Sequence, residues 1–454
     1  MVSILELPGI PFVGGEGPVD SSSVNTVIVG LGKIGLPLAV QAASKGHSVV
    51  GVDVNETTID LINGGHEPFP GEAGLADGLK AAIRDGLLSA TIDMSVALAD
   101  ASTVIIVVPL IVDDDALPDF TALDAATAAV GRALQAGTLV SYETTLPVGT
   151  TRNRFVPALE KASGLRCGED LFVVFSPERV YSGRIFADLK RYPKLVGGVD
   201  EPSTARAIDF YESLLDFDER PDLDRPNGVW DLGSSEASEF AKLAETTYRD
   251  VNIGLANEFA RFADTVGVDV ARVIEASNSQ PFSHIHQPGV AVGGHCIPVY
   301  PRFYLKNDPS ALVPAAARDA NEAMPAYAVG RLENHFGSLR GKRVAILGAC
   351  YRGGVKETAF SGVFPLASSL SDRDATVVVH DPLFLDDELR LLGFEPYHLG
   401  EECDAVIIQA DHAEYRHLTS TDVPGATAIL DGRRCLESSD MLTADGVSVL
   451  RLGG

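Results

Sequence analysis

A cysteine set among glycines is the residue of this chain best placed for covalent chemistry. Cys296 lies in the run 293–298, which reads Gly-Gly-His-Cys-Ile-Pro. The glycines allow close backbone approach, and a neighbouring histidine can favour the thiolate, which is the nucleophilic form of cysteine. The other cysteines show no CxxC or Cys/His spacing, so we interpret them as small buried side chains and predict neither a disulfide framework nor a metal site. They are Cys167, Cys350, Cys403 and Cys435.

A polar stripe on a predicted long helix is a second chemical signal. At 100° per residue the polar side chains fall within an arc of about 120°, whereas the other faces of the helix are apolar. A solvated charged face would explain such a stripe. A lysine enclosed in a site would instead stabilise an oxyanion, and we favour that role for Lys242. The stripe consists of Lys242, Glu245, Thr246, Arg249 and Asn252.

Two further polar runs each follow a predicted strand. The run 143–149 (ETTLPVG) comes after a strand that ends at Ser141, and the run 176–179 (SPER) comes after a strand that ends at Phe175. Open α/β sheets bind ligands at the carboxyl ends of their strands. Each run could instead be a capped turn before a helix, and position alone does not separate the two interpretations.

A glycine-rich turn predicts a dinucleotide cofactor. Residues 30–35 read Gly-Leu-Gly-Lys-Ile-Gly, follow a strand and open a helix, and Asp53 closes the next strand at the spacing of the dinucleotide fingerprint. Backbone N–H groups and the helix N-terminus would receive the pyrophosphate, and Asp53 would accept hydrogen bonds from the ribose hydroxyls. Because residues 54–56 (Val-Asn-Glu) offer no cation to a 2′-phosphate, we predict NAD and not NADP.

The elements that position these residues alternate between strands and helices. From Asn25 the chain reads strand, glycine-rich turn, helix 36–44 and strand 48–53, which is one βαβ unit. Apolar runs predict further strands, and a helix over 234–263 contains no proline. Together they are typical of a doubly wound parallel sheet followed by a linking helix. The further strands are 103–108, 137–141 and 171–175.

A second αβ pattern follows the long helix, with strands predicted at 343–348, 376–381, 404–410 and 427–431. We therefore predict an α/β protein with two Rossmann-like doubly wound domains joined by a long central helix. The predicted parts are an irregular N-terminal extension (1–23), an NAD-binding Rossmann domain (24–215), a central helical and dimerisation domain with the lysine and the cysteine (216–325), and a C-terminal ligand-binding domain (326–454).

The bulk composition limits the class of protein. The 454 residues exceed one ordinary core, with 45% hydrophobic and 22% charged residues. No run approaches the ~20 apolar residues of a membrane span, and residues 1–23 lack the features of a signal peptide, so we expect a cytoplasmic location. The net charge of −27 argues against a nucleic-acid partner. It suits either an ordinary acidic enzyme or a halophilic one.

Taken together, these residues resemble the UDP-glucose/GDP-mannose dehydrogenase family from about Val24 onward. Within that family, SPERV and TYRDVN resemble the UDP-N-acetylmannosamine dehydrogenase branch, because UDP-glucose enzymes carry Phe-Leu at Arg179-Val180 and a second Glu near Ser182. The ordered motifs are GLGKIGLPLA at Gly30, ETTLPVGTT at Glu143, SPERV at Ser176, KLAETTYRDVNIGLANE at Lys242, GGHCIP at Gly293 and DAVIIQADHAEY at Asp404.

The resemblance implies an NAD-dependent, four-electron oxidation of a UDP-sugar C6 alcohol to the acid. Cys296 would capture the aldehyde as a thiohemiacetal, and the thioester formed by the second oxidation would be hydrolysed. The resemblance also implies that Lys242 stabilises oxyanions, and that Glu178 and Thr145 position or activate water. It suggests a homodimer or a higher homo-oligomer.

The resemblance assigns binding residues as well. The implied cofactor residues are Gly30, Gly32, Lys33, Ile34, Gly35, Asp53 and Thr145. The implied substrate residues are Arg179, Val180, Lys242, Thr246, Arg249, Gly293 and, in a C-terminal nucleotide-sugar (UDP)-binding domain, Arg352.

Several positions depart from the family pattern. Tyr300 stands where the family has an Asp after the cysteine, so the usual water-activating carboxylate is absent and Glu178 or another group must replace it. Arg352 stands for a Lys and offers bidentate contacts to phosphate. The remaining departures are Thr246 for Asn, Leu110 for Thr, and Phe282 and Ala359 for common arginines.

Other functions remain open at this point. Within the family, the chain could be a UDP-glucose or GDP-mannose dehydrogenase. A single-step β-hydroxyacid dehydrogenase shares the Rossmann domain and the long helix with a lysine, but it needs no cysteine and no third domain. Because of the departures, the chain could also be a non-catalytic protein that binds a nucleotide sugar or NAD.

Overall fold

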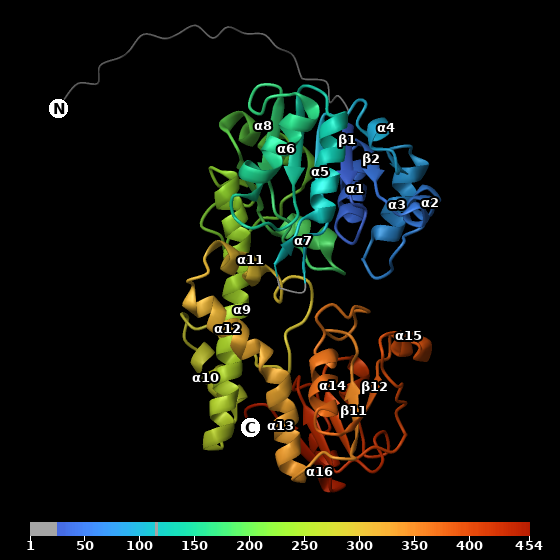
Figure 1. Cartoon of the computed structure of the whole chain (residues 1–454), viewed down its shortest axis with the longest axis vertical. Helices are drawn as coiled ribbons and strands as arrows, with labels where there is room; N and C mark the ends of the chain where they lie inside the picture. Colours follow the sequence, from blue (N-terminus) through green and yellow to red (C-terminus); the bar gives the residue numbers. More distant parts are fainter. Residues whose placement is uncertain (1–24, 114–116) are drawn as a thin grey trace, which may run out of the picture.

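The computed structural model describes residues 25–113 and 117–454. Two α/β units lie at opposite ends of the molecule, and the long helix α9 (Ser235–Val266) runs beside both of them (Figure 1). The predicted N-terminal extension lies outside the described residues. Among the helices of the described ranges, none has both the length and the apolar character that crossing a bilayer requires.

An eight-stranded sheet forms the N-terminal unit, with the order β10-β9-β8-β7-β4-β1-β2-β3. The strands from β8 to β3 in this order are parallel, whereas β9 is antiparallel to β8 and β10 is parallel to β9. A separate hairpin joins β5 (Ile111–Val112) and β6 (Pro118–Asp119). The strands of the sheet are β1 (Asn25–Val29), β2 (Ser48–Val52), β3 (Leu88–Thr91), β4 (Thr103–Ile106), β7 (Thr138–Tyr142), β8 (Leu171–Phe175), β9 (Lys194–Gly198) and β10 (Val229–Asp231).

Helices cover both faces of this sheet because its central strands are apolar on both sides. Every residue of β4, β7 and β8 is buried. The helices are α1 (Gly35–Ser44), α2 (Glu56–Asn63), α3 (Leu75–Arg84), α4 (Met94–Ala97), α5 (Thr121–Ala133), the π-helical turn η1 (Thr151–Phe155), α6 (Val156–Ser163), α7 (Ile185–Arg191) and α8 (Glu201–Leu214).

A smaller parallel sheet forms the C-terminal unit, with the order β12-β11-β13-β14-β15. Its strands are β11 (Arg343–Leu347), β12 (Thr376–His380), β13 (Ala405–Ile408), β14 (Ala428–Asp431) and β15 (Ser448–Arg451). Its helices are α13 (Met324–Phe336), α14 (Val363–Ser371), α15 (Asp386–Leu391), the 3₁₀ turn η2 (Ala413–Tyr415) and α16 (Ser439–Ala444).

Helix α9 contributes to the cores of both units. Ser234 caps its start by accepting a hydrogen bond from the N–H of Ala237, and Gly267 ends it in the left-handed region. Leu243 packs in the N-terminal core, whereas Ala256 and Ala260 pack with the C-terminal sheet. Helices α10 (Val270–Asn278), α11 (Tyr300–Asn307) and α12 (Leu312–Glu322) complete this region. A single helix therefore fixes the spacing of the two units.

The prediction of two Rossmann-like units joined by a long helix is confirmed. The prediction of a wholly parallel first sheet is wrong at its edge, because β9 runs antiparallel to β8. The sheet also continues to β10, past residue 215, where the predicted first domain ends. Strands β3, β9, β10 and β15 escaped prediction because they are short and contain glycine or polar residues, so they show no continuous apolar run.

Candidate active site

The turn between β1 and α1 has the shape of a phosphate cradle. Gly30 has a φ of +95°, and a Cβ there would lie 3.1 Å from the carbonyl oxygen of Val107. A Cβ on Gly35 would overlap the carbonyl oxygen of Gly30, whereas a Cβ on Gly32 would meet nothing within 4 Å. No side chain caps the start of α1, and the positive end of the helix dipole at this turn favours an anion. These residues fit the pyrophosphate of a dinucleotide.

Asp53 follows β2 beside this turn. Its Oδ2 accepts a 2.8 Å hydrogen bond from the N–H of Leu31, and its Oδ1 accepts a 3.0 Å bond from the N–H of Asn55. Each carboxylate oxygen keeps a lone pair for a ribose hydroxyl. The neighbouring Val54 side chain is 98% exposed, and residues 54–56 present no cation to a 2′-phosphate.

Lys33 of the same turn forms an ion pair with the C-terminal unit. Its Nζ lies 2.8 Å from Oε2 of Glu357, and Nε2 of His295 lies 3.5 Å from the same oxygen. Burial would raise the pKa of Glu357, but Lys33 and His295 outweigh burial and hold that pKa below its ordinary value. Glu357 thus joins the cofactor turn to the loop that carries Cys296.

Among the cysteines, Cys296 is the exposed one. Cys350 and Cys403 are buried as predicted, whereas Cys167 and Cys435 are only half-buried. Burial raises the pKa of Cys350 and of Cys435 to about 12 and that of Cys167 to about 11. Burial also raises the pKa of Cys403, so all four of these thiols stay protonated and weakly nucleophilic at neutral pH, and the exposed Cys296 is the remaining candidate nucleophile.

Tyr300 connects Cys296 to Thr145. The N–H of Tyr300 donates a 2.9 Å hydrogen bond to the carbonyl oxygen of Cys296. Its phenol hydroxyl lies near enough to the side chains of Cys296 and Thr145 for both to affect its pKa. Burial and the neighbouring Cys296 raise the pKa of this phenol, so it stays protonated at neutral pH. We call Cys296, Tyr300 and Thr145 the thiol cluster, in which tyrosine acts as a donor and not as a base.

The C-terminal unit holds the cysteine loop in place. The N–H of Gly294 donates a 2.8 Å hydrogen bond to the carbonyl oxygen of Ala359. A Cβ on Gly293 would lie 2.5 Å from Cβ of Tyr351 and 2.9 Å from the carbonyl oxygen of Phe360. Phe360 itself has a φ of +50°, a strained conformation for an aromatic residue. Glycine is therefore required at position 293 for the cysteine loop to approach the segment that carries Tyr351 and Phe360.

Two buried charges, Glu143 and Lys194, and the largely buried Glu178 meet at one edge of the first sheet. Glu143 follows β7, Glu178 lies just beyond β8, and Lys194 opens β9. Nζ of Lys194 lies 3.0 Å from Oε2 of Glu143 and 3.0 Å from Oε2 of Glu178. Tyr211 of α8 donates a 2.6 Å hydrogen bond to Oε1 of Glu143. We call these four residues the carboxylate cluster.

The two carboxylates have opposite pKa shifts. Burial, reinforced by the charge of Glu178, raises the pKa of Glu143 to about 7 against the opposing effect of Lys194. Burial would also raise the pKa of Glu178, but Lys194, the N–H of Arg179 and Lys242 outweigh it and lower that pKa. Glu178 is therefore the ionised member of the pair at neutral pH, and Glu143 is the member that exchanges a proton there.

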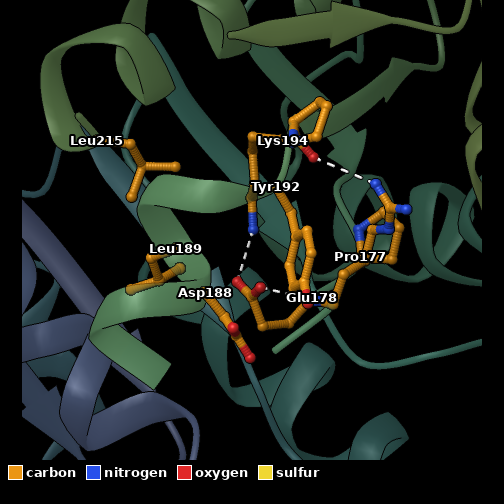
Figure 2. A pocket seen from close by; sticks show the side chains of 9 residues that line it. Pro177, Glu178, Asp188, Leu189, Tyr192, Lys194 and Leu215 are labelled. Carbon is orange, nitrogen blue, oxygen red and sulfur yellow. Dashed lines mark hydrogen bonds and ion pairs between the residues drawn. The ribbon is translucent and has the colours of Figure 1, made fainter. Parts of the chain in front are cut away.

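Figure 2 shows the ammonium of Lys194 facing the carboxylate of Glu178 beside a small cavity. The volume of this cavity is about 10 Å³, which is room for about one water molecule. Asp188, Leu189 and Tyr192 line its other side. The side chains of Lys194 and Glu178 are only 4% and 12% exposed to solvent.

Two members of the polar stripe of α9 are buried at the site, whereas Glu245, Arg249 and Asn252 are partly exposed. Lys242 and Thr246 are buried, and Lys242 lies near enough to Glu178 to lower its pKa. The interpretation of the stripe as a solvated charged face is therefore wrong for these two residues. The hydroxyl of Thr246 donates to the backbone carbonyl oxygens of Lys242 and Leu243, so in this structure it satisfies its own helix.

Three guanidinium groups surround the segment 179–182. Nε of Arg179 lies 2.9 Å from Oε2 of Glu245, Arg249 contacts the hydroxyl of Tyr181, and Nη2 of Arg352 lies 3.4 Å from the carbonyl oxygen of Ser182. Arg352 comes from the C-terminal unit. Arg179 lies in the segment that follows β8 of the N-terminal unit, and Arg249 lies on α9. This arrangement suits an anionic ligand between the two units.

The structure places some predicted residues outside these contacts. Val180 is a partly buried member of the N-terminal core, and Phe282 is 92% exposed. Leu110 is buried in the core of the first unit. Sequence reasoning gave no role to Glu143 and passed over Lys194 and Tyr211. Glu143 could have been noticed from its position at the end of a strand. Lys194 could not, because it stands at the start of its strand.

Cys350, Asp381 and His412 of the C-terminal unit also lie together, with ligand-type atoms within 4.8 Å of one another. The Asp381 carboxylate already accepts hydrogen bonds from the N–H groups of Ala349, Cys350 and Leu383. Because the Cys350 thiol is also held protonated, this cluster fits a hydrogen-bonded structural role better than a metal site.

Sequence comparison matches the chain to three consecutive models of one family. They are the UDP-glucose/GDP-mannose dehydrogenase family NAD binding domain at residues 24–215, its central domain at 236–324 and its UDP binding domain at 345–438. The chain is also 35% identical to the UDP-N-acetyl-D-mannosamine dehydrogenase of Pyrococcus horikoshii, over 90% of this chain and 95% of that protein.

Solved structures show the same similarity. The structure of the UDP-D-ManNAc dehydrogenase from Pyrococcus horikoshii superposes with a TM-score of 0.83 at 31% identity, covering 94% of this chain and 99% of that one. A UDP-glucose dehydrogenase from Pyrobaculum islandicum superposes with a TM-score of 0.82 at 27% identity, covering 97% and 100%. The fold is therefore shared between relatives that bear different substrate names.

Proposed function

Because this chain belongs to the UDP-glucose/GDP-mannose dehydrogenase family, and is thus an NAD-dependent nucleotide-sugar dehydrogenase, we propose that it oxidises UDP-N-acetyl-D-mannosamine to UDP-N-acetyl-D-mannosaminuronate. The observation that carries the reaction type is the thiol cluster, in which the one exposed cysteine of the chain is held by a protonated phenol. The substrate follows the names of the relatives and the Arg179-Val180 pair.

In this proposal Cys296 attacks the aldehyde that the first oxidation produces. The residues that would hold NAD, which accepts the hydride in each of the two oxidations when bound, are Gly30, Gly32, Lys33, Ile34, Gly35, Asp53 and Thr145. Lys242 stabilises the oxyanions that form at the sugar carbon, because a buried ammonium interacts strongly with developing negative charge. Glu178, the ionised carboxylate beside Lys242, accepts a proton from the water that hydrolyses the thioester.

Each of the three predicted domains has its own role in the proposed reaction. Residues 24–215 bind NAD, residues 216–325 supply Lys242 and Cys296, and residues 326–454 bind the UDP moiety. Arg179, Arg249 and Arg352 surround the diphosphate, while Val180, Thr246 and Gly293 contact the substrate. The guanidinium groups around segment 179–182 support this arrangement.

The test is the number of NADH molecules formed per sugar consumed. The proposal expects two NADH per UDP-N-acetylmannosamine for the unaltered enzyme. Cys296→Ser should lose turnover to the acid, because serine at this position lacks a comparably nucleophilic anion. Full turnover by Cys296→Ser would exclude the covalent mechanism, and one NADH per sugar would indicate a single-step dehydrogenase. No NADH with any nucleotide sugar would indicate a binding protein.

UDP-glucose and GDP-mannose are the alternative substrates. The similarity to the UDP-glucose dehydrogenase of Pyrobaculum islandicum supports UDP-glucose as one of them. A panel of the three purified nucleotide sugars separates them. NADH formation with UDP-glucose but not with UDP-N-acetylmannosamine would overturn the substrate assignment and leave the reaction type intact.

A homodimer is also part of the proposal. An apolar stripe follows one side of α9, and its members are exposed in the single chain. They are Phe240, Tyr248, Leu255, Phe259, Phe262 and Val266. An uncovered stripe of this kind is a usual mark of a protein interface. A cytoplasmic location and a halophilic surface remain predictions, the latter supported by the net charge of −27.

A further inference from the structure

The hydrolysis of a thioester needs one base, but the carboxylate cluster contains two carboxylates. The side chains of Glu143 and Lys194 are buried and that of Glu178 is 12% exposed; with all three ionised they carry a net charge of −1, which the nearby Lys242 offsets at Glu178. Burial favours the protonated form of a carboxylate, so the more deeply buried Glu143 can hold an additional proton. Glu178 alone borders Lys242, whereas Glu143 lies deeper against Tyr211.

We propose that Lys194 and Glu143 form a proton relay that carries the proton released by the hydrolytic water from Glu178 into the interior of the first sheet. The proposal rests on the thioester chemistry of the proposed function and deepens it. Glu143 and Lys194 act through Glu178 and are therefore positioning residues. Lys194 is suited to the task because its Nζ lies 3.0 Å from an oxygen of each carboxylate.

The step balances as follows. The water oxygen forms a bond to the thioester carbon, and its proton passes to Glu178. The carbon–sulfur bond then breaks, and its electron pair leaves on Sγ of Cys296. Lys194 donates a proton to Glu143 and takes one from Glu178, so Lys194 stays an ammonium, Glu178 returns to its carboxylate and Glu143 holds the proton. The sugar leaves as its acid, and Glu143 later returns the proton through Lys194 to Glu178, the partly exposed member of the cluster, from which solvent takes it.

The surroundings favour this direction of transfer. Tyr300, which contacts the thiol, is protonated and cannot accept the proton of the water. Burial raises the pKa of Glu143 to about 7, so this carboxylate can gain and lose a proton near neutral pH. The ionisable groups that face the two carboxylates are Lys194 between them, Tyr211 on Glu143 and Lys242 near Glu178. Tyr211 has a raised pKa and stays a donor.

The first test is Glu143→Gln in the full-length enzyme, studied by rapid mixing with NAD and UDP-N-acetylmannosamine. We expect a burst of two NADH per active site at the unaltered rate, followed by turnover slowed roughly 10²-fold, which is within the range of proton-transfer effects. The thioester should accumulate on Cys296 and be visible in the mass of the intact protein. Hydroxylamine, which attacks a thioester without help from a base, should restore turnover and yield a hydroxamate.

The second test keeps both carboxylates. Tyr211→Phe removes the hydrogen bond that lowers the pKa of Glu143. In the unaltered enzyme the hydrolysis rate should fall as the pH drops through about 7, because Glu143 is then already protonated. Tyr211→Phe should move this fall to higher pH, a change that a merely structural role would not produce. Glu239→Gln serves as the control, because Glu239 is also a buried carboxylate but bonds the turn at Gly149 and Thr151. The ratio of hydrolysis to hydride transfer should not change in it.

Either of two outcomes overturns the relay. The first is hydrolysis of the thioester by Glu143→Gln at the unaltered rate, and the second is a pH profile of Tyr211→Phe that coincides with that of the parent. The failure of the proposed function is recognised separately, because the unaltered enzyme would then form no thioester with any of the three nucleotide sugars.

Discussion

At the scale of single residues, Tyr300 determines what surrounds the reactive thiol. Its phenol lies beside the side chains of Cys296 and Thr145, and burial raises its pKa, so it stays protonated at neutral pH. A neutral hydroxyl beside the sulfur adds no like charge next to a nucleophilic thiolate, whereas a carboxylate in the same place would repel one. In the proposed mechanism the tyrosine therefore assists nucleophilic attack, and base catalysis is assigned to Glu178.

Tyr300→Phe should slow the capture of the aldehyde. A hydrogen bond to a charged group contributes roughly 1.5–3 kcal/mol, so the rate of NADH formation in the burst should fall roughly 10- to 100-fold. The rate at which iodoacetamide alkylates Cys296 at pH 7 should fall in parallel. Tyr304→Phe, one turn further along α11, is the matched control and should change neither rate. An unchanged alkylation rate in Tyr300→Phe would contradict the role of the phenol.

At the scale of elements, α9 holds the two units at a fixed spacing. Its first half packs in the core of the NAD-binding unit through Leu243, and its second half packs with the C-terminal sheet through Ala256 and Ala260. Gly254 lies where α12 crosses it, and a Cβ there would lie 3.1 Å from Cα, Cβ and the carbonyl oxygen of Ala317. This contact makes the glycine a packing requirement.

Gly254→Ala and Gly330→Ala should therefore have opposite effects on stability. Alanine in a helix stabilises by up to about 1 kcal/mol relative to glycine. At Gly330 in α13 a Cβ would meet nothing within 4 Å, so the gain should be realised. At Gly254, crowding in a packed contact costs about 1–3 kcal/mol and should outweigh it. Thermal unfolding should show Gly330→Ala above the parent and Gly254→Ala below it. Equal gains in the two variants would mean that α9 and α12 are not closely packed.

At the scale of the whole molecule, the site exists only where the two units meet. Lys33 and Glu357 form an ion pair across the units, Gly294 donates to Ala359, and Arg352 reaches the carbonyl oxygen of Ser182. Each contact joins a segment of the cofactor or thiol region to the C-terminal unit. The cofactor turn, the cysteine and the predicted UDP-binding unit are therefore positioned relative to one another by one set of contacts.

The exposed stripe on α9 predicts that two chains associate. Phe262, 66% exposed, lies on this stripe. The protein should have twice the 48.0 kDa mass of one chain by sedimentation equilibrium. Phe262→Glu should shift it towards the monomer, because association would bury an unpaired charge. Leu391→Glu on α15, at an even more exposed leucine, is the control and should leave the dimer intact. A parent protein that sediments as a monomer at micromolar concentration would disprove the interface.

The sequence alone determined the features that depend on local periodicity. The turn at 30–35, the following strand with Asp53 and the long helix through Lys242 are each encoded within a few consecutive turns or strands of chain. Cys296 could be singled out because its glycine-rich surroundings are adjacent in the chain. For the same reason, the two αβ patterns sufficed to predict two Rossmann-like units.

Tertiary structure alone decided which side chains are partners. Lys194 meets Glu143 and Glu178 because β9 runs antiparallel to β8, and no short-range pattern in the run Lys194–Gly198 reveals that direction. Tyr300 meets Thr145 because α11 packs against a turn from a distant part of the chain. Burial, which sets the proton affinity of Glu143, arises from the packing of several elements at once. Motifs therefore identify the reacting groups, whereas long-range packing sets their charges and their proton exchange.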